Sequence, residues 1–120
     1  MTTPPTANYG VIFDVNAIDR DLRQEDAYTR TGHTARTLVR ERDLRVVQVA
    51  MKAGSRIAQH RADETATVHV LIGHLRLRLP SGVVDLAAGQ FLLLERGVPH
   101  DVEAVAETRF LLTLGWKNPA

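Results

Sequence analysis

The chain has 120 residues, which is enough for one domain with a buried core. Its 15 basic and 14 acidic residues leave a net charge of +1, and the arginines are scattered, so we expect neither a nucleic-acid partner nor an acidic membrane surface. Because the chain contains no cysteine, disulfides, thiolate metal sites and a cysteine nucleophile are excluded.

The two ends of the chain carry no strand pattern. Residues 1–8 are polar and contain proline, and we expect residues 1–16 to form an N-terminal arm that is partly mobile, with residues 117–120 as a mobile tail. Residues 17–33 are rich in charge and leave a thin apolar stripe, which predicts an irregular or short helical segment. No stretch has the roughly twenty apolar residues that cross a bilayer, and no leader pattern is visible. We therefore expect no membrane partner and a cytoplasmic location.

Short segments of alternating residues predict β-strands over residues 34–116. Residues 44–51 are largely apolar in both alternating sets, which indicates a strand covered on both faces. Residues 74–79 alternate leucine with histidine or arginine, which indicates one buried and one wet face. Residues 91–94 and 110–114 are continuously apolar and are predicted to be buried strands. Turns containing glycine or proline separate these segments, a pattern typical of an all-β, antiparallel sandwich or small barrel.

Two segments of the chain, residues 54–73 and 89–100, combine glycine and histidine at fixed spacings. Their spacing is similar to that of the two motifs of the cupin superfamily, and the resemblance spans residues 44–114. It implies a small single-domain cupin with a jelly-roll β-barrel or sandwich, in which inward side chains distant in sequence meet. The matching positions are Gly54, His60, Gly73, Gly89, Gly97 and His100.

Only two of the four usual metal ligands of the two motifs are present in this sequence. Ala62 stands where the family has a second histidine and Ala66 where it has a glutamate, so the motifs are degenerate. The resemblance implies His60 and His100 as ligands of one divalent transition metal (iron, copper, zinc, manganese or nickel), or no metal at all. Glu64 is a third candidate because it has the same parity as His60 along an extended segment.

Two hypotheses of different class remain open. The first is a small-molecule binding protein without tightly bound metal, whose pocket is lined by His60, Ala62, Ala66 and His100, because the alanines enlarge and dry the pocket. The second is a metal-dependent enzyme resembling cupin dioxygenases or isomerases, with His60 and His100 as ligands and a further donor such as Glu64. A metal-free enzyme with one of these histidines as general acid or base lies between them.

The apolar strands also predict a protein partner. Residues 68–71 and 111–114 offer more apolar strand surface than one barrel interior needs, and cupins of this size resemble proteins that pair as homodimers through an outer sheet. His69 has the parity of an outward residue and is expected to face solvent or a partner subunit. His74 and Glu95 are expected to be solvated.

Overall fold

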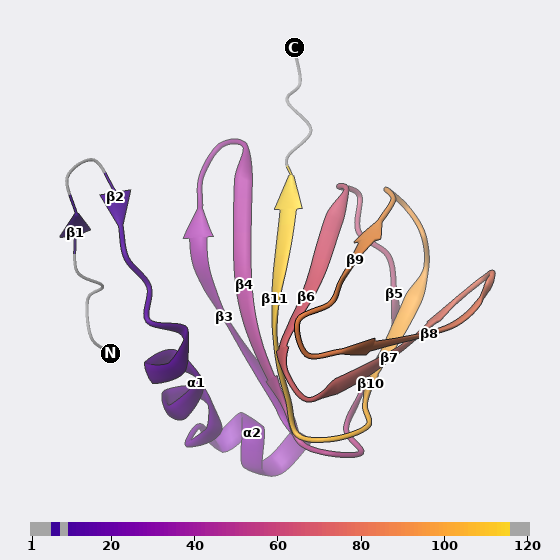
Figure 1. Cartoon of the computed structure of the whole chain (residues 1–120), viewed down its shortest axis with the longest axis horizontal. Helices are drawn as coiled ribbons and strands as arrows, with labels where there is room; N and C mark the ends of the chain where they lie inside the picture. Colours follow the sequence, from indigo (N-terminus) through magenta and orange to yellow (C-terminus); the bar gives the residue numbers. More distant parts are fainter. Residues whose placement is uncertain (1–5, 8–9, 116–120) are drawn as a thin grey trace.

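The computed structural model describes residues 6–7 and 10–115, which form two helices and eleven strands (Figure 1). The predicted tail, residues 117–120, lies outside the described residues, as do residues 1–5 and 8–9 of the predicted arm. The helices are α1 (Val15–Arg23) and α2 (Asp26–Thr31). The strands are β1 (Thr6–Ala7), β2 (Gly10–Val11), β3 (His33–Arg40), β4 (Leu44–Met51), β5 (Arg56–His60), β6 (Ala66–Ile72), β7 (His74–Leu79), β8 (Gly82–Ala87), β9 (Phe91–Leu94), β10 (His100–Ala104) and β11 (Thr108–Gly115).

Antiparallel pairing assembles most strands into two sheets that face each other. The larger sheet has the order β3-β4-β11-β6-β9, and the smaller has the order β5-β10-β7-β8, while β1 and β2 form a separate ribbon. The chain crosses between the large and small sheets several times, for example from β6 to β7 and from β9 to β10, as in a jelly roll. The prediction of an all-β, antiparallel jelly-roll sandwich is confirmed, and the two sheets do not close into one continuous barrel.

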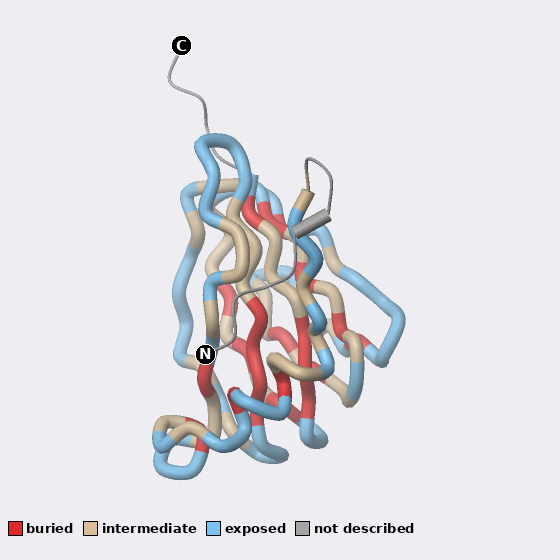
Figure 2. Tube along the Cα trace, turned by 90° about the vertical axis from the view of Figure 1, so that its left-hand side faces the viewer, coloured by how far each residue is buried: buried red, intermediate tan, exposed pale blue. Residues whose placement is uncertain are grey.

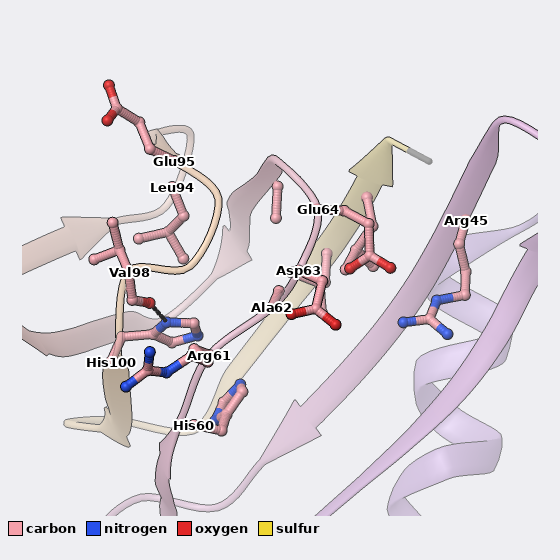
Figure 3. Close-up of a pocket in the computed structure, with 13 residues that line it drawn as sticks. Arg45, His60, Arg61, Ala62, Asp63, Glu64, Leu94, Glu95, Val98 and His100 are labelled. Atoms are coloured by element: carbon pink, nitrogen blue, oxygen red, sulfur yellow. Dashed lines mark hydrogen bonds between the residues drawn. The ribbon is translucent and has the colours of Figure 1, made fainter. Parts of the chain in front are cut away.

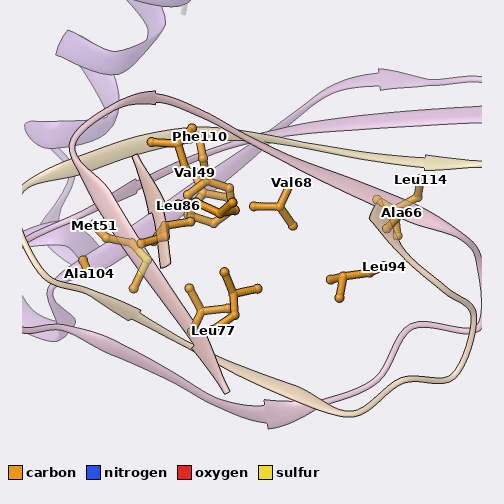
Figure 4. Packing of buried hydrophobic residues seen from close by; sticks show 13 residues of the cluster. Val49, Met51, Ala66, Val68, Leu77, Leu86, Leu94, Ala104, Phe110 and Leu114 are labelled. Carbon is orange, nitrogen blue, oxygen red and sulfur yellow. The ribbon is translucent and has the colours of Figure 1, made fainter. Parts of the chain in front are cut away.

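The core lies between the two sheets, where inward side chains of both interdigitate (Figure 4). Leu75 and Leu77 of β7 are fully buried, as are Met51 of β4 and Val70 of β6, and Phe110 of β11 joins them. The alternation predicted for residues 74–79 is therefore present in β7. Figure 2 shows buried residues concentrated in the middle of the strands, whereas turns are exposed.

Helix formation starts earlier than the predicted boundary at residue 17. The side chain of Asp14 accepts hydrogen bonds from the backbone N–H groups of Asn16 and Ala17, and this cap allows α1 to begin at Val15. The chain is helical until Thr31, after which β3 begins at His33. In the part of the chain that the structure describes, no helix is long and apolar enough to span a membrane.

The second half of strand β4, residues 48–51, is covered on both faces, as its composition predicted, whereas Leu44 at its start is exposed. Leu22 of α1 and Tyr28 of α2 pack against Ala50 on the outer face of β4. The side-chain amide of Gln48 donates a hydrogen bond to the carbonyl oxygen of Val15, at 2.8 Å. The helices therefore cover the outer face of the large sheet at the β3 and β4 side (Figure 1).

Strand β9 corrects the prediction that residues 91–94 are continuously buried. Leu94 is buried, but Phe91 is 65% exposed and Leu93 is 58% exposed. The reason is that β9 is the short edge strand of the large sheet, and the helices cover the opposite end of that sheet. Only one face of β9 therefore enters the core.

Candidate functional site

A cavity of about 310 Å³ opens at one end of the sandwich, where β5, β9 and β11 end and β4, β6 and β10 begin (Figure 3). Strand alternation directs small and branched apolar side chains into it from the large sheet, and the small sheet contributes His60 and His100. The apolar lining residues are Ala62, Ala66, Leu94, Val98, Leu112 and Leu114. The volume lies at the lower end of the range of about 300 to 1,000 Å³ that is usual for small-molecule sites.

His60 and His100 lie side by side in the wall of this cavity. They are register partners on the neighbouring strands β5 and β10, and their ring centroids are 4.3 Å apart at an interplanar angle of 63°. His100 is only 6% exposed, whereas His60 is exposed to solvent. The spacing predicted from the two motifs therefore brings one buried and one exposed imidazole together.

Both imidazoles make the same kind of hydrogen bond, from Nδ1 to the backbone carbonyl oxygen two residues earlier in the chain. Nδ1 of His60 lies 3.0 Å from the carbonyl oxygen of Ala58, and Nδ1 of His100 lies 3.0 Å from that of Val98. Because a carbonyl oxygen can only accept, each Nδ1 carries the hydrogen, and in the neutral ring the lone pair is on Nε2. No hydrogen bond among the described residues uses either Nε2, so both nitrogens remain available to a ligand.

The structure brings the predicted site residues into one cavity wall. Ala62, Glu64 and Ala66 follow β5 and line the same cavity as the two histidines. Ala66 is buried. The loop that contains Ala62 is held in place by a hydrogen bond from the N–H of Gly97 to the carbonyl oxygen of Ala62, at 2.8 Å. That these residues contact a ligand or a metal stays a prediction.

Sequence reasoning did not identify the other charged residues of the cavity. Arg45 enters from β4 on the wall opposite the histidines, and Arg61 and Asp63 lie in the loop after β5 (Figure 3). The sequence feature that would have identified Arg45 is its spacing of four residues from Val49, which places both side chains on the inward face of the same strand. Glu95 lines the cavity as well, although it was expected to be only solvated, and its carboxylate points outward in Figure 3.

The donor set does not fit a tightly held metal ion. Among the described residues, no group of three or more histidine, aspartate or glutamate side chains is placed so that it could hold one. His60 and His100 supply two nitrogens, and Glu64 does not complete the set. Structural and catalytic ions in proteins normally take three or four protein donors, so the expected transition metal has no complete cage here.

Two further histidines lie on the outer faces of the sheets. His69 of β6 faces away from the core, as predicted, and its ring centroid is 6.2 Å from that of Phe91. Nε2 of His74 lies 3.1 Å from a carboxylate oxygen of Asp85 on the outer face of the small sheet. This hydrogen bond lowers the pKa of Asp85. Neither histidine belongs to the cavity.

Comparisons with known proteins agree with this fold. A family model described as Cupin domain matches residues 47–114. A conserved protein of unknown function from Streptococcus pyogenes is similar in structure, with a TM-score of 0.74 and 22% identity over 98% of this chain and 97% of that one. A cupin superfamily protein from Desulfitobacterium hafniense has a TM-score of 0.68 and 10% identity over 71% of this chain and 78% of the other. KdgF from Halomonas sp. has a TM-score of 0.65 and 16% identity, over 72% and 82%. No curated protein sequence matched the chain.

Proposed function

This chain belongs to the Cupin domain family, and we propose that it binds a small organic molecule in the cavity beside His60 and His100. The cavity has the form expected of such a site, since apolar side chains of the large sheet and of the flanking loops make much of its wall and a few polar groups converge on it. A ligand at this position would bury an apolar body against residues such as Leu94 and Leu112.

The observation that carries the proposal is the shared hydrogen-bonding pattern of the two imidazoles, in which Nδ1 of each ring is bonded to the backbone. Each presents an Nε2 lone pair that no described residue uses, and the two rings are 4.3 Å apart. Because each Nε2 lone pair can only accept a hydrogen bond, the site favours a ligand with hydrogen-bond donors, such as hydroxyl or amine groups. The proposed ligand is therefore a small molecule with an apolar body and a donor-bearing polar end.

The charged residues at the cavity support a ligand that is polar at one end only. Arg45 and Arg61 contribute positive charge, and Asp63 and Glu64 contribute negative charge. Glu95 adds a further negative charge, but its carboxylate points outward, so the cavity has no large excess of either sign of charge. We propose that the charged side chains hydrogen-bond to the polar end of the ligand and to the water around it.

A titration followed by protein NMR tests this function. Small alcohols, polyols and amino alcohols are added in turn, and we expect the signals of His60 and His100 to shift together with those of Leu94. In the variant His100→Phe, which keeps a ring in place but removes the acceptor, binding should weaken roughly tenfold. The matched control is His74→Phe on the outer face of the small sheet, which should bind as the parent does. If the titrated signals do not include the cavity residues, or if His100→Phe binds unchanged, the proposal is wrong.

A second function is favoured by the difference in burial between the two rings. His100 is buried in the cavity wall while His60 is exposed, so together they could pass a proton between solvent and a bound molecule. In this reading a bound carbonyl compound exchanges the hydrogens next to its carbonyl group with solvent. Deuterium incorporation in D₂O that depends on His100 would support this activity, and incorporation at the uncatalysed rate would argue against it.

A further inference from the structure

The polar groups at one side of the cavity require a ligand that both donates and accepts hydrogen bonds. Nε2 of His60 and Nε2 of His100 can each accept one hydrogen bond, because Nδ1 of each ring already donates to the backbone. Arg61 follows His60 directly and lines the same cavity, and its guanidinium can only donate. A hydroxyl group satisfies both kinds of partner, whereas an ammonium group only donates and a carboxylate only accepts.

The presence of two imidazoles determines how many hydroxyls the ligand needs. Each hydroxyl has one hydrogen to donate, so two hydroxyls are required to satisfy both Nε2 atoms. The two rings belong to register partners on the neighbouring strands β5 and β10, and their centroids are 4.3 Å apart. Hydroxyls on adjacent carbon atoms are spaced to reach such a pair together, whereas hydroxyls at opposite ends of a carbon ring are not.

We propose that the cavity binds a vicinal diol carried on a small apolar body. This inference rests on the proposed function, because it names the class of ligand for the same cavity. The remaining wall suits the apolar body, since Leu94, Leu112 and Leu114 line the cavity beside the histidines. A six-membered carbon ring with two neighbouring hydroxyls is small enough to enter a cavity of about 310 Å³.

The charges of the lining favour an uncharged diol over an ionic ligand. Arg45 and Arg61 are offset by Asp63 and Glu64, so the cavity has no large excess of charge that would compensate an ion. An ion also loses more hydration than a hydroxyl group when it enters an apolar wall. The polar end of the ligand is therefore a neutral pair of hydroxyls.

A titration of the full chain with ring compounds, followed by protein NMR, tests this inference. Cis-cyclohexane-1,2-diol, cyclohexane-1,4-diol and cyclohexanol share the apolar ring and differ in the number and spacing of their hydroxyls. The 1,2-diol should bind roughly fivefold more tightly than either of the others, because it makes one more hydrogen bond to the imidazoles. Cis-2-aminocyclohexanol, which is a cation at neutral pH, should bind more weakly than the 1,2-diol.

His60→Phe keeps a ring in place and removes one of the two acceptors. This variant should bind the 1,2-diol and cyclohexanol with nearly equal affinity. Because His60 is exposed, it should also melt close to the parent temperature, as measured by circular dichroism. The matched control is His74→Phe, on the outer face of the small sheet, which should keep the full preference for the 1,2-diol.

The possible outcomes separate this inference from the proposed function. Equal affinity of the parent for the three uncharged compounds, with shifted signals of His100 and Leu94, would overturn the diol inference and leave the small-molecule site in place. Unshifted signals of these residues with every compound would overturn both. Tighter binding of the amino alcohol than of the 1,2-diol would overturn the diol inference, as would a His60→Phe variant that keeps the preference or a His74→Phe variant that loses it.

Discussion

Replacing Gly73 by alanine is expected to reduce the free energy of unfolding by several kcal/mol. Gly73 connects β6 to β7, where the chain passes from one sheet to the other, and its φ is +97°. An added Cβ would lie 2.3 Å from the carbonyl oxygen of Glu107 and 2.4 Å from Oγ1 of Thr108. These atoms have little freedom to move away, because Oγ1 of Thr108 also accepts the N–H of His74 at 3.0 Å.

Two separate effects contribute to this loss. An L-residue in left-handed backbone costs about 1–2 kcal/mol, and overpacking against fixed atoms costs about 1–3 kcal/mol more. The expected total is roughly 2–5 kcal/mol, which is a large share of the stability of a domain of this size. Gly54 separates the two effects, because its φ is +85° but no atom lies within 4 Å of an added Cβ. Gly54→Ala should therefore lose only about 1–2 kcal/mol.

Urea unfolding followed by circular dichroism measures both variants against the parent. Gly73→Ala should have a much lower midpoint than Gly54→Ala, with similar dependence on denaturant concentration in both. Thermal melting gives an independent comparison, since about 1 kcal/mol corresponds to several degrees in a domain of this size. Equal losses at the two positions would refute the reasoning, because they would mean that the close approach at Gly73 does not matter.

Three further predictions concern the site, a helix end and an ion pair. Adding back the two missing donors, as Ala62→His together with Ala66→Glu, should produce a protein that retains close to one metal ion per chain, measured by elemental analysis; metal content as low as in the parent would contradict the alignment of the motifs. Asp14→Ala removes the cap of α1 and should lower the free energy of unfolding by about 1 kcal/mol in a urea titration, and an unchanged midpoint would show that the cap is unimportant. The hydrogen bond from His74 lowers the pKa of Asp85, so this carboxylate stabilises the fold above its ordinary pKa range and the effect is lost as pH falls through the lowered value. Asp85→Asn should therefore be less stable than the parent at neutral pH, with a difference that shrinks on acidification; a gap independent of pH would speak against the linkage.

Much of the fold could be predicted because local patterns and long-range packing agree. The alternation in residues 74–79 matches the pleat of β7, and the apolar character of both sets in residues 44–51 matches a strand covered by the core on one side and by helices on the other. For residues 91–94 the local pattern and the long-range packing do not agree, and the prediction of a buried strand was wrong for this reason. A continuously apolar strand is consistent with burial on both faces, and only the arrangement of the whole sheet decides that Phe91 remains exposed.

The candidate site was predicted in part. Motif spacing placed His60 and His100 in one cavity wall, because positions in two antiparallel strands become neighbours when the strands pair in register. The spacing did not reveal that Nδ1 of each ring is taken by a nearby carbonyl oxygen, since this depends on side-chain rotation. Arg45 was missed because a charged residue near a strand end resembles a solvated one, and only the facing sheet makes its surroundings a cavity.

The position of β5 at the edge of the small sheet affects how the cavity exchanges its contents. Within the described chain β5 pairs only with β10, and four of its five residues are exposed. Segments with few buried contacts open locally at much lower free energy than the core. Fraying of β5 would move His60 away from His100 and open the cavity sideways while the rest of the sandwich stays folded. Amide hydrogens of residues 56–60 should therefore exchange faster than those of β6, and a bound molecule that bridges the two imidazoles should slow them.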